Sequence, residues 1–194
     1  MKNYWFIIKN YNYILLGLLL ILTGCQQMSE VETDTSAGLN GGFEVSKKGL
    51  PVNWLMYSPT TVPDADFEIE LDKSIFKEGK QSLRFKVKKC SSTGGWISPG
   101  FTNEFFGIGK FEGEGVYKLS FWIKNNGTKY RVNAGGVAPL KGDMKVLVES
   151  AEEIEEWKYL EYKINIPKDR HLKMELNILE PGTFWIDDIQ IEKI

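Results

Sequence analysis

The stretch Ser82-Leu-Arg-Phe-Lys-Val-Lys88 alternates between apolar and basic side chains without interruption. Successive side chains of a β-strand point to opposite faces, so this pattern predicts a strand with one buried and one solvated face. The stretch Tyr117-Lys-Leu-Ser-Phe-Trp-Ile-Lys124 has the same period, which places Phe121 inward and Trp122 on the outer face. Both segments therefore indicate β-sheet rather than helix.

Further strands are expected where short alternating runs are bounded by Gly, Pro, Asn or Asp. These runs cover residues 67–71, 129–134, 158–166, 172–179 and 183–192. The side chains expected to face the core are Leu83, Phe85, Val87, Tyr117, Leu119, Phe121, Ile123, Leu160, Tyr162, Ile164, Ile166, Leu172, Met174, Leu176 and Ile178. A helical period is present only weakly, at 147–157. About eight or nine strands at regular spacing indicate an all-β domain built as a β-sandwich.

The composition excludes several functional classes. The chain has 24 Lys and Arg against 26 Asp and Glu, a balance that does not supply the basic surface needed to bind nucleic acid. One histidine, His171, and two distant cysteines do not make a zinc, haem or iron–sulfur site. Glu153 and Glu155 lie in an acidic run typical of a solvated loop, and His171 has no nucleophile motif beside it. We therefore expect a protein that is not an enzyme.

The N-terminus has the features of an export signal. An uncharged run from Tyr13 to Leu22 follows two lysines, and it is shorter than the roughly 20 apolar residues of a membrane-spanning helix. The segment Leu22-Thr-Gly-Cys25 resembles the bacterial lipobox, in which a cysteine after two small residues carries diacylglycerol. This resemblance implies a lipoprotein signal peptide at residues 1–24 and a lipidated Cys25. The alternative is a buried or disulfide-bonded Cys25.

Residues 25–38 show no apolar period and combine small polar with acidic residues, so we expect the lipidated cysteine and a flexible tether here. The folded domain is expected at residues 39–194. Gln26 rather than aspartate follows the cysteine, which by resemblance to Gram-negative lipoproteins does not signal retention at the inner membrane. We expect a monomer in the bacterial cell envelope, lipid-anchored to the outer membrane on its periplasmic or surface side. With Cys25 acylated, Cys90 has no partner for a disulfide.

Six segments between residue 39 and the end of the chain carry a second resemblance. They are Leu39-Asn-Gly-Gly-Phe-Glu44, Pro51-Val-Asn-Trp54, Glu78-Gly-Lys-Gln-Ser-Leu-Arg-Phe85, Tyr117-Lys-Leu-Ser-Phe-Trp-Ile-Lys124, Glu156-Trp157 and Gly182-Thr-Phe-Trp-Ile-Asp-Asp-Ile-Gln-Ile191. In order and spacing they resemble carbohydrate-binding modules of the family four, nine and twenty-two type. The first and last segments are specific, whereas the middle ones are common in β proteins. The resemblance implies a jelly roll of galactose-binding-like topology, with a structural calcium and a sugar-binding site.

The same resemblance indicates Glu44 and Asp187 as side-chain ligands of calcium. In a jelly roll the first and last strands lie near each other, so two carboxylates from opposite ends of the chain can converge. Calcium accepts roughly six to eight oxygens with loose angular demands, and carbonyls of the turn Glu78-Gly79-Lys80 can add to the set. Asp188 is a weaker candidate, because a bulge decides which acid points inward. The alternative is that both aspartates are solvated and that Glu44 pairs with a lysine.

Sugar binding requires aromatic rings outside the core. The C–H face of a sugar stacks on Trp and Tyr rings, and its hydroxyls need polar partners. The candidate ligand residues are Trp96, Trp122, Tyr57, Tyr130, Arg131 and Asn133. Each ring among them has core packing as its alternative, and we expect Trp54 and Trp157 to be structural.

The sequence thus predicts a lipid-anchored, calcium-stabilised β-sandwich that binds a polysaccharide or oligosaccharide without catalysis. Two alternatives stay open. An adhesion module would present its exposed aromatic rings to a protein partner on a flat surface. A small hydrolase or lyase would bring at least two titratable groups together in a cleft.

Overall fold

A computed structural model describes residues 31–103, 113–138 and 141–194, and residues 31–194 form one compact unit. The predicted signal peptide and Cys25 lie outside the described residues. The strands are β1 (Ser46–Lys47), β2 (Leu50–Pro51), β3 (Leu55–Tyr57), β4 (Asp66–Asp72), β5 (Ser82–Lys89), β6 (Gly100–Thr102), β7 (Gly115–Asn126), β8 (Tyr130–Ala138), β9 (Lys141–Ser150), β10 (Ile154–Ile166), β11 (His171–Ile178) and β12 (Gly182–Lys193), with short 3-10 helices η1 (Thr35–Ala37) and η2 (Gly95–Ile97).

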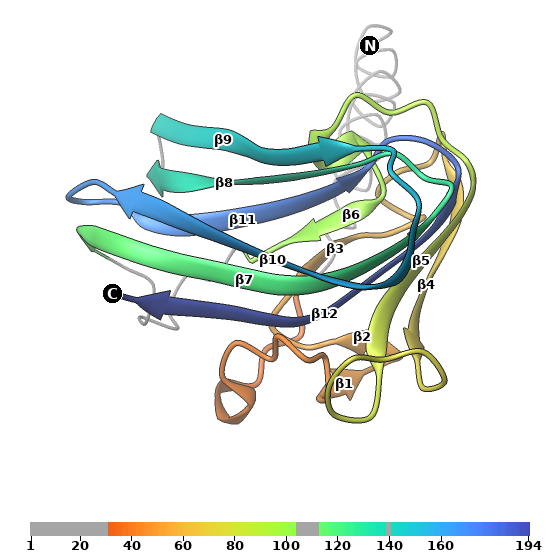
Figure 1. The fold of residues 1–194 in the computed structure, drawn as a ribbon, viewed down its shortest axis with the longest axis horizontal. Coiled ribbons are helices and arrows are strands. Elements are labelled where there is room, and N and C mark those ends of the chain that lie inside the picture. The colour runs from red at the N-terminus through yellow and green to blue at the C-terminus, as the bar shows by residue number, and fades with distance from the viewer. Residues whose placement is uncertain (1–30, 104–112, 139–140) are drawn as a thin grey trace, which may run out of the picture. The chain divides into compact units, whose positions relative to one another are not determined.

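Two five-stranded antiparallel sheets make the sandwich, and β1 and β2 pair as a separate two-stranded sheet. The β7 sheet has the order β10-β7-β12-β5-β4, and the β8 sheet has the order β3-β6-β11-β8-β9. Figure 1 shows β9, β8 and β11 running side by side, and β10, β7 and β12 likewise. Aromatic contacts join the sheets: the ring centroids of Phe85 and Phe101 are 6.2 Å apart, and those of Tyr130 and Phe184 are 4.7 Å apart. The predicted all-β jelly-roll sandwich is confirmed.

The side chains expected to face the core do so. All of them are buried except Leu160 and Tyr162, which are half-buried and pack against the same core from the edge strand β10. Tyr162 stacks on Phe121 with ring centroids 6.2 Å apart. Because a strand has period two, this agreement also fixes which side chains point outward, and it places Trp122 on the outer face as predicted.

The weak helical period at 147–157 does not correspond to a helix in the structure. Residues 141–150 form β9, which pairs with β8, and β10 begins at Ile154. Val132 pairs with Val148, but Asn133 pairs with Val146, so Leu147 is an extra residue in β9. Such a bulge breaks the two-residue alternation in the sequence, which explains why this strand was not recognised.

The segment before residue 39 is attached to the domain from Glu32 onward. The Asn53 amide nitrogen donates to the backbone oxygens of Asp34 and Gly38 at 2.6 and 2.9 Å, and its side-chain oxygen accepts the Asp34 N–H at 2.8 Å. Lys48 forms an ion pair of 2.6 Å with Glu32. Part of the segment expected as a tether, from Glu32 to Gly38, is therefore in contact with the folded domain. Within the described residues, no helix has the length and apolar character to cross a membrane.

Candidate functional site

Polar side chains gather on the outer face of the β8 sheet. On β11, Met174 and Leu176 are fully buried in the core, so Glu175 and Asn177 point outward. Strand pairing puts Glu175 directly opposite Asn133 on β8, and Asn177 opposite Arg131. Two of the sequence-predicted ligand residues, Arg131 and Asn133, are therefore neighbours of two residues that the prediction missed.

Tyr57 reaches the same face from β3. It pairs with Gly100 of β6, which pairs in turn with Asn177 of β11. A Cβ atom at Gly100 would lie 1.9 Å from the carbonyl oxygen of Leu176, so only glycine lets β6 approach β11 this closely. The Tyr57 hydroxyl then donates a hydrogen bond of 2.5 Å to Oε1 of Glu175. Tyr57 is only 6% exposed, so its role is to fix the Glu175 carboxylate rather than to stack on a ligand.

Hydrogen-bonding groups on this face are left free for a ligand. The half-buried side-chain amide of Asn133 has no hydrogen bond to any residue that the structure describes. Oε1 of Glu175 accepts the hydrogen bond from Tyr57, and Oε2 has no hydrogen-bond partner among the residues that the structure describes. An amide can donate twice and accept, and a carboxylate oxygen accepts. The pair is suited to bind neighbouring hydroxyl groups.

An exposed tryptophan lies in a loop attached to the same face of the β8 sheet. Trp96 lies in η2 and is 72% exposed. The loop before it is held on the β8 sheet by Asn177, whose side chain accepts from the Gly95 N–H at 3.1 Å and donates to the Gly95 oxygen at 3.2 Å. Arg131 Nη1 donates to the Thr93 oxygen at 3.0 Å. Trp96 is therefore exposed but anchored at its base.

Glycine is required in this loop. Gly94 has φ +106°, and a Cβ atom there would lie 2.7 Å from Nη1 of Arg131. The guanidinium is also paired, because Arg131 Nε is 2.6 Å from Oε2 of Glu149. Hydrogen bonds from Lys129 and from Arg131 lower the pKa of Glu149 below its usual value. Arg131 thus positions the Trp96 loop, and its charge is balanced.

Tyr130 is a correction to the predicted site. It alternates with Val132 and Ala134 on the inner face of β8, is 1% exposed, and packs on Phe184. Burial raises its pKa to about 12. Tyr130 is a core residue that a ligand on the outer face does not reach.

Trp122 is separated from the other candidates. It lies on the outer face of the β7 sheet, whereas Trp96, Arg131 and Asn133 belong to the β8 sheet and its loop. Lys77 Nζ lies 4.3 Å from the centroid of the Trp122 ring, and the Tyr159 ring centroid is 5.1 Å away. The six candidates therefore do not form one site.

The two predicted calcium ligands converge on one loop, as expected, and both accept backbone N–H groups there. Asp187 is fully buried, and its Oδ2 accepts the N–H groups of Lys77 and Glu78 at 2.7 and 3.0 Å. Glu44 Oε1 accepts the N–H of Lys80 at 2.8 Å. Burial raises the pKa of Asp187, against the lowering effect of the N–H groups of Glu78 and Lys77. We call this arrangement of Asp187 and Glu44 on residues 77–80 the loop clasp.

The loop clasp does not fit calcium as it stands. Calcium needs oxygen ligands, but both oxygens of Asp187 and Oε1 of Glu44 already accept backbone N–H groups. Within residues 31–103, 113–138 and 141–194, no group of three or more His, Cys, Asp or Glu side chains lies close enough to hold a metal ion, so a calcium here would need backbone carbonyls as well. The structural calcium remains a prediction from sequence.

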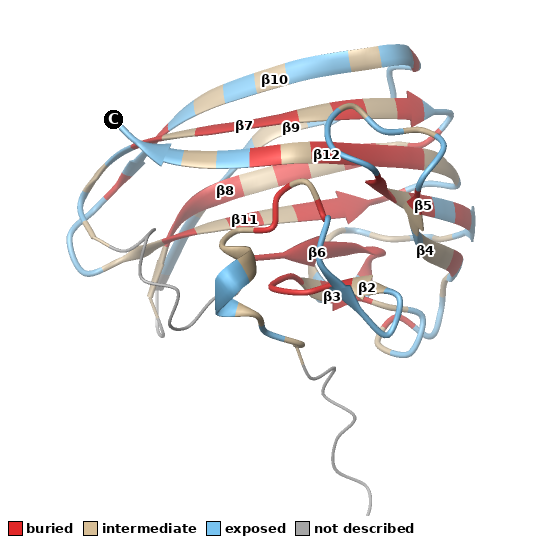
Figure 2. Cartoon of the chain, turned by 90° about the horizontal axis from the view of Figure 1, so that it is seen from below, coloured by how far each residue is buried: buried red, intermediate tan, exposed pale blue. Residues whose placement is uncertain are grey.

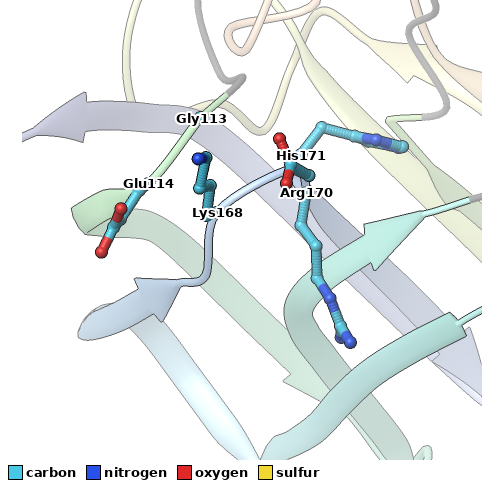
Figure 3. Close-up of a pocket in the computed structure, with 6 residues that line it drawn as sticks. Gly113, Glu114, Lys168, Arg170 and His171 are labelled. Atoms are coloured by element: carbon cyan, nitrogen blue, oxygen red, sulfur yellow. The ribbon is translucent and has the colours of Figure 1, made fainter.

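A pocket of about 470 Å³ lies at the start of β11. It is lined by Gly113, Glu114, Lys168, Asp169, Arg170 and His171. Figure 3 shows that the side chains of Lys168 and His171 point away from each other, and Arg170 Nη1 donates to the Gly136 oxygen at 3.2 Å. Charges of both signs line the pocket, but Lys168 and His171 do not face each other and so do not form an acid–base pair.

No known protein family and no curated protein matches this chain. Solved structures do share its fold. A family 22 xylan-binding domain from Paenibacillus barcinonensis has a TM-score of 0.55 and 14% identity, covering 79% of this chain and 92% of that domain. The C-terminal family 22 carbohydrate-binding module of a Clostridium thermocellum xylanase has a TM-score of 0.55 and 15% identity, covering 84% of this chain and 96% of that module.

A longer structure from Clostridium thermocellum combines a family 22 module with the catalytic module of endo-1,4-β-D-xylanase 10B, in complex with xylohexaose. It has a TM-score of 0.55 and 16% identity over 73% of this chain, which spans only 26% of that protein. At such low identity these comparisons establish the fold, a jelly roll of the type seen in carbohydrate-binding modules.

Proposed function

We propose that this domain binds a polysaccharide or oligosaccharide, without catalysis, on the outer face of the β8 sheet. The observation that carries the proposal is the pairing of Glu175 with Asn133, with free hydrogen-bonding groups, on the face to which the loop of the exposed Trp96 is attached. Sugars are amphipathic: their C–H faces stack on aromatic rings, and their hydroxyls bind amides and carboxylates.

The parts of the face have separate roles in this proposal. Trp96 stacks on one sugar ring, and Glu175 with Asn133 binds hydroxyls of a neighbouring sugar. Tyr57 orients the Glu175 carboxylate, while Asn177 and Arg131 hold the Trp96 loop in place. Xylan-binding domains with this fold make a plant polysaccharide the first ligand to test, although their similarity is one of fold. Non-catalytic modules among these structures support binding rather than hydrolysis.

The first prediction concerns Trp96. Replacing it with alanine is expected to weaken binding to a glycan by about tenfold or more, because a few anchoring side chains dominate binding energy. The melting temperature should stay the same, since the ring is 72% exposed. Affinity electrophoresis against a panel of soluble polysaccharides measures the effect.

Ile97→Ala is the matched control, because Ile97 is the next residue of η2 and is 50% exposed. It should leave binding nearly unchanged. Glu175→Gln should also weaken binding, since it removes the charge from the acceptor. If the unaltered protein binds no glycan in the panel, or if Trp96→Ala and Glu175→Gln bind as well as it does, this proposal is wrong.

We also propose that the chain is a lipoprotein of the bacterial cell envelope, anchored through Cys25 at the outer membrane. The lipobox-like segment Leu22–Cys25 supports this proposal. Cys25→Ser is expected to release the protein from the membrane fraction, because acyl chains rather than a helix would supply retention. Fractionation of cells followed by a salt wash tests it. Retention of the serine variant after the wash would contradict the lipid anchor.

A further inference from the structure

An aromatic pair occupies the outer face of the β7 sheet. Trp122 of β7 and Tyr159 of β10 are direct cross-strand partners, with ring centroids 5.1 Å apart and ring planes tilted by 53°. Trp122 points outward, because its neighbours Phe121 and Ile123 are fully buried in the core, and Tyr159, its direct cross-strand partner, lies on the same face. Tyr159 remains 45% exposed. In Figure 2, β10 is exposed or half-exposed along most of its length, so this edge of the sheet is open.

A lysine completes this group. Lys77 is fixed by its own backbone N–H, which donates to the buried carboxylate of Asp187. Its ammonium lies 4.3 Å from the centroid of the Trp122 ring. Among the described residues Lys77 has no acidic partner, whereas Lys88, Lys118, Lys129 and Lys158 each form an ion pair. An ammonium over a ring, without a carboxylate, is ready to accept an anion.

We propose that Tyr159, Trp122 and Lys77 form a second glycan-binding site that takes a sugar residue carrying a carboxylate, namely a uronic acid. The pyranose ring stacks on the exposed Tyr159, and the carboxylate pairs with the Lys77 ammonium. The Tyr159 hydroxyl lies 2.8 Å from Oε2 of Glu161, and the negative charge of that residue orients the sugar with its carboxylate toward Lys77. No bond is made or broken.

The two sites differ in chemistry and in position. The outer face of the β8 sheet offers the Glu175 carboxylate, which favours hydroxyl groups and repels anions. The outer face of the β7 sheet offers an ammonium and two rings. The faces belong to different sheets with the core between them, so the two sites bind separate segments of glycan. A polysaccharide with both neutral and acidic residues would be held at two points, which raises its overall affinity.

The test uses the full chain purified in detergent and affinity electrophoresis. The probes are polygalacturonate, alginate and glucuronoxylan, each compared with its carboxyl-reduced form. Lys77→Gln and Tyr159→Ala are expected to weaken binding to at least one charged polymer by about tenfold or more and to leave binding to the reduced forms unchanged. Tyr159→Phe keeps the ring and should retain binding.

Lys163→Gln is the matched control for charge. Lys163 is exposed on the same face of β10, directly opposite Lys118, and its removal should have little effect. If Lys77→Gln and Lys163→Gln weaken binding to the charged polymers equally, the attraction is non-specific electrostatics between the polymer and surface lysines, and the proposal is overturned. Equal binding of charged and reduced polymers would also overturn it. Trp96→Ala reports on the other face alone, so failure of the first site and failure of this one are distinguishable.

Discussion

Asp187→Asn is expected to lower the free energy of unfolding by roughly 2 to 4 kcal/mol, because it removes a buried charged acceptor from backbone N–H groups. Oδ2 of Asp187 holds the N–H groups of Lys77 and Glu78, and Oδ1 holds that of Asp188. An asparagine has only one oxygen, so at least one of these donors loses its acceptor. Denaturant unfolding followed by tryptophan fluorescence measures the loss.

Asp188→Asn provides the comparison. Asp188 is half-buried and has φ +48°, a conformation that asparagine tolerates. Within the part of the chain that the structure describes, its side chain accepts a hydrogen bond only from the Gln190 side chain, at 2.9 Å. It should change the stability by about 0.5 kcal/mol or less. A loss for Asp188→Asn as large as that for Asp187→Asn would contradict the loop clasp.

The same variants test the calcium predicted from sequence. A clasp made by N–H groups needs no ion, so the melting temperature of the unaltered protein should be the same in EDTA and in calcium. An ion bound only by the folded state would instead add about 2.7 kcal/mol at a hundredfold excess over Kd. A melting temperature that falls in EDTA, with the difference lost in Asp187→Asn, would support the calcium predicted from sequence and contradict a loop clasp without an ion.

The fold could be predicted from the sequence because alternation reports directly on which side chains are buried. In β11, Leu172, Met174 and Leu176 occupy every second position, and all three lie in the core. The same alternation assigns Tyr130 to the inner face together with Val132. The prediction of Tyr130 as a ligand residue is therefore inconsistent with the alternation in its own strand. Where the bulge at Leu147 interrupts the period, the prediction of β9 failed.

The candidate site could be predicted only in part. Arg131 and Asn133 were identified as polar positions on a strand, and Trp96 as a ring in a glycine loop. Glu175 was missed, although its outward position follows from the pattern of β11. Its importance depends on strand order: β11 lies between β6 and β8, which brings Tyr57 to one side and Asn133 to the other. Contacts between residues 118 apart in the chain are a property of topology, which local periodicity does not encode.

Trp54→Ala is expected to lower the free energy of unfolding by about 3 to 5 kcal/mol, the cost of emptying a buried indole site. Trp54 is 2% exposed, and its ring centroid lies 5.0 Å from that of Phe101 and 5.8 Å from that of Phe43. It joins the N-terminal segment to β6, because its Nε1 donates to the Asn40 oxygen at 3.1 Å. Such tilted and edge-on ring contacts add to the area that the side chain buries.

Two further variants separate the causes of this loss. Trp54→Phe keeps a ring between Phe43 and Phe101, and the Asn40 oxygen still accepts the Phe43 N–H at 3.0 Å, so the loss should be only roughly 1 to 2 kcal/mol. Trp157→Ala removes the same side chain from β10, where Trp157 is half-buried at an irregular point of the pairing with β7. Its cost should be clearly smaller than that of Trp54→Ala, because less apolar surface becomes exposed to water. Thermal and denaturant unfolding of all three variants measure these losses of stability. If Trp157→Ala lowers the free energy of unfolding as much as Trp54→Ala does, the core extends further under β10 than the burial of its side chains indicates.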